Sequence, residues 1–293
     1  MRYLIQIGWK IISAPFRFIR WIARSIINWM RNIIVDIKTF FSEEPEDTAL
    51  GETLAKTVNA PEDVLLHLSA LRKNLTRSVL FLLITTILSF FFSRNILEFL
   101  ALPLPGGADS LKAIDVTEPI GTLMRISLLA GFVLALPYIV FELYRFIAPG
   151  VSIKSRTWGL IGIPIVVIFF AGGMAFAYFV MLRPALEFLT GGILGIETEP
   201  RPSSYIGFIT SLLFWVGVSF QFPLIIFVLA GMGIIKAKSL SQHWRIAIVI
   251  IAIVAALITP TIDPINMGLI MGPLIALYFL SILLANIAQR GRD

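Results

Sequence analysis

The stretch that most constrains the fold is TEPIGTLMRISLLAGFVLALPYIVFELYRFIAPGVSIKSR, residues 117–156. Its apolar run from Ile126 to Ile147 is long enough to cross a hydrocarbon core, which takes about 20 residues as a helix. Pro137 predicts a bend within this run, because proline removes a backbone hydrogen bond. Pro149-Gly150 predicts the end of the helix. Basic residues around that end predict that it faces the cytoplasm: Arg145, Lys154 and Arg156.

Further apolar runs predict an all-α, polytopic membrane protein with six transmembrane helices within residues 62–293. Besides the run at 126–147, we expect spans at about 79–99, 158–182, 205–229, 246–258 and 265–287. The composition agrees, because 57% hydrophobic and 14% charged residues give more apolar surface than a soluble core needs. The last two runs look short, and short spans imply local bilayer thinning or packing against a partner.

The basic residues predict the orientation of these spans. With both termini inside, 19 of the 24 lysines and arginines fall in cytoplasmic segments and five fall outside. Lysine and arginine are enriched in cytoplasmic loops. We therefore expect an N-in, C-in protein whose net charge of +6 is explained by its loops rather than by nucleic-acid binding.

Several kinds of chemistry have no sequence support. The chain has no cysteine, and its two histidines, His67 and His243, are far apart in the sequence. This pattern predicts no disulfide and no metal site. Glycine-rich phosphate loops and serine-nucleophile elbows do not occur, so we expect no cofactor and no enzyme activity.

The first 41 residues predict an amphipathic helix rather than a signal peptide or a span. Basic residues interrupt every apolar run and recur every seven positions: Lys10, Arg17, Arg24, Arg31 and Lys38. Such a basic stripe suits a helix lying in the plane of an anionic membrane surface. Docking of a partner subunit and self-association are the alternatives. Residues 42–61 carry five acids and predict a solvated linker.

Polar residues between the apolar runs predict the remaining elements. Residues 62–78, EDVLLHLSALRKNLTRS, predict a short amphipathic helix before the first span. The segments 100–120 and 183–204 predict outer connectors. Gln221, in VGVSFQFPLII, is the clearly polar residue in the middle of a span. An amide buried in lipid needs a partner, which predicts a hydrogen bond between helices of this chain or a contact elsewhere.

The order and spacing of six short motifs resemble the TatC family, the polytopic subunit of the twin-arginine protein translocase. They are HLSALRKNL, DVTEPI, FIAPG, GMAFAYF, GVSFQ and TPTIDP, and the resemblance covers residues 62–287. It implies a glove-like set of six tilted helices in a prokaryotic cytoplasmic membrane. It also implies recognition of twin-arginine signal peptides at the cytoplasmic side, transport driven by the proton-motive force, and no enzyme activity.

The resemblance also implies roles for particular residues. Binding of the signal peptide falls to positions in the opening motif and the first cytoplasmic loop: His67, Leu71, Arg72, Phe146, Pro149 and Ser155. Gln221 takes the position associated with the small single-span partner subunits, of the TatA and TatB type. Pro119 and Asp263 belong to further motifs. Membrane lipids and a second copy of the chain are the other expected partners.

Two departures from the family pattern concern the binding of the two arginines of the signal peptide. Guanidinium groups prefer carboxylates, yet Ala70 and Ser155 stand where the family commonly has acids. The candidate substitute acids are Glu62, Asp63 and Glu142. For Glu142, an alternative role is an internal ion pair with Arg145, which lies three residues later on the same helix.

These observations leave three functional hypotheses. The chain is a working signal-peptide receptor with displaced acids or mostly hydrophobic contacts. Alternatively, it is a divergent scaffold of the same family that does not read the arginine pair. A small-solute secondary transporter is the third hypothesis, and it is disfavoured because such proteins usually show internal repeats or charges at mid-depth. Residues 1–41 are expected to occupy a cytoplasmic surface position like that of the partners' own amphipathic helices.

Overall fold

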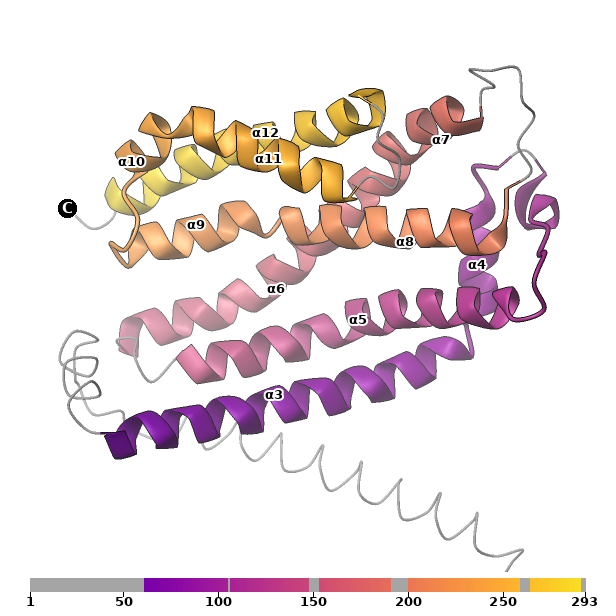
Figure 1. Cartoon of the computed structure of the whole chain (residues 1–293). Coiled ribbons are helices and arrows are strands. Elements are labelled where there is room, and N and C mark those ends of the chain that lie inside the picture. The colour runs from indigo at the N-terminus through magenta and orange to yellow at the C-terminus, as the bar shows by residue number, and fades with distance from the viewer. Residues whose placement is uncertain (1–60, 105, 148–152, 191–199, 259–263, 291–293) are drawn as a thin grey trace, which may run out of the picture. The chain divides into compact units, whose positions relative to one another are not determined.

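The computed structural model describes residues 61–104, 106–147, 153–190, 200–258 and 264–290, which form helices and turns and contain no strand. These ranges all fall within one compact unit, Ala49–Asp293 (Figure 1). The predicted amphipathic helix at 1–41 lies outside the described residues. So does the predicted linker, apart from Pro61, which begins the first described helix.

The elements follow one another as helices joined by short connections. They are α3 (Pro61–Phe90), α4 (Ser93–Ala101), the 3-10 turn η1 (Gly107–Ser110), α5 (Glu118–Ile147), α6 (Ile153–Phe176), the π-helical turn η3 (Ala177–Met181), α7 (Leu182–Thr190), α8 (Pro202–Ser219), α9 (Phe222–Gly231), α10 (Ala237–Gln242), α11 (Trp244–Ile258) and α12 (Pro264–Arg290).

Five helical stretches in the described ranges are long and apolar enough to cross a membrane. They are Leu71–Phe90, Glu118–Phe146, Gly162–Glu187, Pro202–Gly231 and Met267–Gln289. The helix α11 is apolar but shorter, with 15 residues. The predicted class, an all-α polytopic membrane protein, is confirmed.

The beginning of the first span differs from the prediction. Instead of a short helix followed by a span at 79–99, α3 runs without a break for 30 residues and ends at Phe90. Its polar residues fit inside a helix, because hydroxyls such as that of Thr76 donate to the carbonyl one turn back, here Arg72 O at 2.8 Å. Ser93 donates to Phe90 O at 2.7 Å and so satisfies a carbonyl at the end of α3.

The sixth span is not short, contrary to the prediction. The helix α12 has 27 residues, and 23 of them form the apolar stretch Met267–Gln289. Ser281 does not interrupt it, because its buried hydroxyl donates to Leu277 O at 2.7 Å. Only α11 keeps the short length that the sequence predicts.

The fourth span is broken in its middle, at Phe220 and Gln221, into α8 and α9. Pro223 explains the break, because it has no N–H to donate to the carbonyl of Ser219 one turn back. In contrast, α5 continues through Pro137. Gln221 therefore lies at a break where backbone groups are less completely paired than in a regular helix.

The packing that positions the site centres on α5, which lies against α3 on one side and against α6 and α8 on others (Figure 1). The contact with α3 is close at Gly131. A Cβ there would lie 2.6 Å from the Cα of Thr86, so a larger residue would collide with backbone. Thr85 donates to Gly131 O at 2.8 Å across the same contact. Small residues allow such close approach of helices in lipid.

Candidate functional site

The predicted signal-binding residues come from three segments, and the structure describes part of them. His67, Leu71 and Arg72 lie on α3, where Leu71 is 38% exposed and Arg72 is also exposed. Phe146 is half-buried in the last turn of α5. Ser155 falls in the first turn of α6, and Pro149 lies outside the described residues.

Two contacts join the middle of α3 to the last turns of α5, so the start of α3 lies at the same end of the membrane domain as the end of α5 (Figure 1). Asn74 donates from Nδ2 to Glu142 O at 3.4 Å, and Arg77 Nη1 lies 3.8 Å from Glu142 Oε1. Since α6 begins shortly after α5 ends, its first turn belongs to this end as well (Figure 1). The residues that the resemblance implicates in peptide binding therefore come from neighbouring segments.

The candidate acids have unequal access to this surface. Glu142 is 1% exposed, and its Oε1 accepts a hydrogen bond of 2.5 Å from the hydroxyl of Tyr138. The ion pair with Arg77 comes from a different helix and was not indicated by the sequence, which suggested Arg145. Glu142 Oε2 is buried and has no hydrogen-bond partner among the described residues. Glu62 and Asp63 lie in the first turn of α3.

Gln221 makes the hydrogen bond within the chain that was one of its two predicted roles. Its Nε2 donates to Val166 O on α6 at 2.9 Å. Its Oε1 is buried and lacks a partner within the part of the chain that the structure describes. One half of the amide is thus satisfied by α6, and the acceptor half remains available. Asp263, of the TPTIDP motif, lies outside the described residues.

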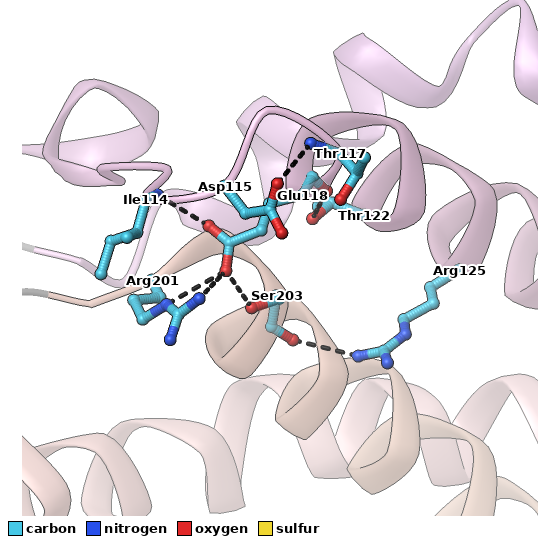
Figure 2. A network of polar contacts seen from close by, with 8 residues as sticks. All are labelled: Ile114, Asp115, Thr117, Glu118, Thr122, Arg125, Arg201 and Ser203. Carbon is cyan, nitrogen blue, oxygen red and sulfur yellow. Dashed lines mark hydrogen bonds and ion pairs between the residues drawn. The ribbon is translucent and has the colours of Figure 1, made fainter.

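At the opposite end of α5, a polar cluster surrounds Glu118, and sequence reasoning missed it (Figure 2). Glu118 is the first residue of α5, and its side chain is 7% exposed. Its Oε1 accepts from Arg201 Nε at 3.0 Å, from the same guanidinium at Nη2, and from Ser203 Oγ at 2.8 Å. Its Oε2 accepts from Ile114 N at 2.9 Å. We call Glu118, Arg201, Ser203 and Ile114 the Glu118 cluster.

The local sequence explains why Glu118 is held at this position. Pro119 is exposed in the first turn of α5, where a missing N–H costs no helical hydrogen bond. Thr117 N donates to Asp115 Oδ1 at 3.2 Å just before the helix, and Thr122 Oγ1 donates to Glu118 O at 2.8 Å just inside it. The carboxylate also lies at the helix N-terminus, which favours negative charge.

The residues of this cluster are recognisable in the sequence, but nothing in the sequence indicates that they contact one another. Pro119 was predicted as a motif residue, and Arg201 was counted only as a loop charge. Glu118 is an isolated acid directly before a spanning run, and Arg201 precedes Pro202 at the start of another. An expected ion pair between these two opposite charges, each at the start of a span, would have predicted the cluster. The cluster joins α5 to α8.

Potential metal ligands are scattered over the part of the chain that the structure describes. Across the described ranges, no group of three or more histidine, aspartate, glutamate or cysteine side chains could hold a metal ion. The polar side chains described above serve instead in hydrogen bonds and ion pairs between helices.

Comparison with known proteins gives a consistent match over most of the chain. The profile of the family described as Sec-independent protein translocase protein (TatC) matches residues 66–273. A protein of that description from Deinococcus radiodurans is 34% identical over 250 residues, 83% of this chain and 92% of the relative. Another from Helicobacter pylori strain J99 is 36% identical over 234 residues, 78% of this chain and 90% of the relative.

A solved structure gives the same match in three dimensions. The crystal structure described as twin arginine translocase receptor TatC superposes with a TM-score of 0.68 at 32% sequence identity. The match covers 76% of this chain and 99% of the solved chain. The described helices of this chain therefore follow the arrangement of that fold.

Proposed function

Since this chain belongs to the TatC family of Sec-independent protein translocase proteins, we propose that it is a component of the twin-arginine translocase. In this role it acts as signal-peptide receptor and assembly platform for export of folded proteins, without enzyme activity of its own. The observation that carries the proposal is the arrangement at one end of the fold. There the middle of α3, directly after the opening motif, is joined to the last turns of α5 through Glu142.

We propose that this end faces the cytoplasm of a prokaryotic cell and that both termini lie on the same side. The uneven distribution of lysine and arginine supports the orientation. The Glu118 cluster then lies toward the outer surface, where it ties together the outer ends of α5 and α8. Residues 1–41 are proposed to lie along the cytoplasmic surface of the membrane.

The two arginines of a signal peptide need anionic partners, and burial separates the candidates. Glu142 is 1% exposed and already contacts Tyr138 and Arg77, which argues against direct contact with a peptide. We therefore propose Glu62 and Asp63 as the acids that compensate for Ala70 and Ser155. Glu142 acts as a positioning residue that fixes α3 against α5.

Gln221 is the proposed contact for the small single-span subunits of the translocase. Its side chain is half-buried, and its Oε1 accepts no hydrogen bond among the described residues, so a donor from a partner helix would complete it once the amide turns toward that helix. The break between α8 and α9 leaves backbone groups nearby that a partner could also engage. Self-association is proposed as a further property of the assembly.

A divergent scaffold is the second candidate, favoured by one specific observation. Alanine and serine occupy the two positions where carboxylates are expected, and neither can pair with a guanidinium. Such a protein would assemble with the translocase but would not distinguish arginine from lysine in the signal.

Export in cells distinguishes the two candidates. The chain is produced in a bacterium lacking its own TatC, together with its cognate small subunits and a folded reporter carrying a twin-arginine signal. A receptor exports this reporter and fails with a twin-lysine signal. Equal export of both reporters, or no export despite normal membrane levels, contradicts the receptor assignment. Deleting residues 1–41 in the same assay tests the proposed surface helix.

A further inference from the structure

A cavity of about 560 Å³ opens between α3, α5 and α8, away from the peptide-binding motifs. Volumes of roughly 300–1,000 Å³ are typical of sites that hold small ligands. Its walls are mostly apolar and include large side chains from all three helices: Leu82, Leu128, Phe132, Phe214 and Trp215. An apolar cavity of this size beside membrane-spanning helices is accessible to lipid.

One charged residue lies in the wall of this cavity. Arg125 is exposed, and its Nη1 donates to Ser203 O at 3.1 Å (Figure 2). Its guanidinium lies against α8 at Gly207, where a Cβ would be 2.5 Å from Nη1. Within the described ranges, no carboxylate lies within ion-pair distance of it, because Glu118 pairs with Arg201 instead. Exposed Ser211, one turn along α8, adds a hydroxyl to the same wall.

The position of Arg125 along α5 places its charge near the membrane boundary. The spanning stretch Glu118–Phe146 has 29 residues. At about 1.5 Å per residue it is roughly 43 Å long, so it exceeds a hydrocarbon core of about 30 Å by roughly 7 Å at each end. Arg125 is about 10 Å from the start of the helix. Its guanidinium points back to the first turn of α8, so it reaches the level of lipid phosphates.

The apolar part of the cavity continues from this charge toward the membrane interior. On α5, Leu128 and Phe132 follow Arg125 at helical spacing, and on α8, Phe214 follows Gly207. Both helices begin at the Glu118 cluster, so they run in the same direction. A cation at headgroup level with an apolar groove beneath it is complementary to an anionic headgroup and its acyl chain.

We propose that this groove is a binding site for one anionic phospholipid. The phosphate accepts hydrogen bonds from the guanidinium of Arg125, and one acyl chain lies along Leu128, Phe132 and Phe214. The bound lipid fills the space between α3, α5 and α8 near the Glu118 cluster. A carboxylate from a partner helix would satisfy the charge but would not account for the apolar cavity that continues below it.

Native mass spectrometry of the purified full-length chain tests the site. Phosphatidylglycerol is compared with phosphatidylcholine at equal concentration. We expect one tightly retained phosphatidylglycerol, with retention reduced about tenfold in Arg125→Gln and partly kept in Arg125→Lys. Arg94→Gln is the matched control, because Arg94 is 86% exposed on α4 and pairs with Glu98. Equal effects of the Arg125 and Arg94 changes would overturn the proposal.

Two further arms separate lipid from other occupants. Leu128→Trp fills the groove without changing charge and is expected to reduce retention as well, and the melting midpoint of each variant establishes that it is folded. Soluble glycerol 3-phosphate should not displace the lipid, and displacement at equal concentration would exclude a role for the groove. A photoreactive acyl chain should label α5 at 125–132 and α8 at 207–215. Labelling elsewhere, or a change only in oligomeric mass with Arg125→Gln, would contradict lipid binding.

Discussion

Individual side chains in this protein fix helices to one another mainly by satisfying groups that lipid cannot solvate. Glu118 accepts four hydrogen bonds from three residues, and three of them come from α8 or the residue before it. Gly131 joins two helices in a different way, because the absence of a side chain lets α3 and α5 approach closely. For substitutions at each of these two positions, the chain offers a control residue of the same type in a less constrained place.

Replacement of Glu118 by glutamine is expected to loosen the joint between α5 and α8. Arg201 would lose its anionic partner, and one amide oxygen would replace a carboxylate that accepts all four bonds. We expect the melting midpoint in detergent to fall further than in Ser203→Ala, which removes one donor only. Glu98→Gln is the control, because Glu98 is 60% exposed and pairs with Arg94 on the surface. A Glu118→Gln midpoint equal to that of Glu98→Gln would contradict this role.

Gly131→Ala should destabilise the protein by about 1–3 kcal/mol, because the new methyl group meets the backbone of Thr86 at 2.6 Å. Gly121→Ala on the same helix has nothing within 4 Å of the added carbon and should be neutral or slightly stabilising. Thermal unfolding followed by circular dichroism measures both. Similar midpoints for the two variants would show that the close approach of α3 and α5 is not required.

Among the elements, the short helix α4 depends on its neighbours for stability. Its last carbonyls cannot be satisfied within the helix. Tyr178 donates to Phe99 O at 2.7 Å and Tyr205 donates to Leu100 O at 2.9 Å, from η3 and α8 respectively. Two tyrosines from other elements thereby complete the end of α4.

Tyr205→Phe should leave the buried carbonyl of Leu100 without a partner and cost about 1–3 kcal/mol. Amide hydrogen exchange should accelerate over α4 and the residues that follow it, while α12, which packs mainly against α9 and α11, keeps its protection. Tyr178→Phe should add to the effect in the double variant. Uniform acceleration across the molecule would instead indicate global destabilisation.

The sequence predicted the positions of the spans well, and it predicted less well where individual helices begin, end or break. The length of the apolar runs located the spans, because a long apolar segment is stable as a helix across the bilayer and unfavourable when exposed to water. It did not predict that α3 continues through the polar residues near Thr76, since the compensating hydrogen bonds are made one turn back in the same helix. The break before Pro223 was likewise visible only as a proline within a spanning run.

In the candidate site, too, the sequence predicted some features and not others. Motif positions such as Leu71 and Phe146 were predicted from residues close together in sequence. The pairs of Glu118 with Arg201 and of Glu142 with Arg77 were not predicted, because Arg201 is 83 residues away from Glu118 and Arg77 is on a different helix from Glu142. Such pairs become visible only when the helices are packed together.

For the whole molecule, the proposed orientation can be measured directly because the chain has no cysteine. Lys112 and Lys238 are exposed in the connection before α5 and in α10, respectively. In intact cells with a permeable outer envelope, Lys112→Cys should react with a membrane-impermeant maleimide. Lys238→Cys should react only after the membrane is opened. The reverse labelling pattern would contradict the N-in, C-in orientation.

Recognition of the arginine pair of a signal peptide is the property that we propose for this protein. Photocrosslinking of a twin-arginine signal peptide to the protein in membranes, with a twin-lysine peptide as the control, tests it most directly. We predict selective crosslinks to α3 near its start and to the segment around 150–157, reduced in a Glu62→Gln/Asp63→Asn double variant. Equal or absent crosslinking of the two peptides to folded protein would contradict recognition of the arginine pair and leave a scaffold role.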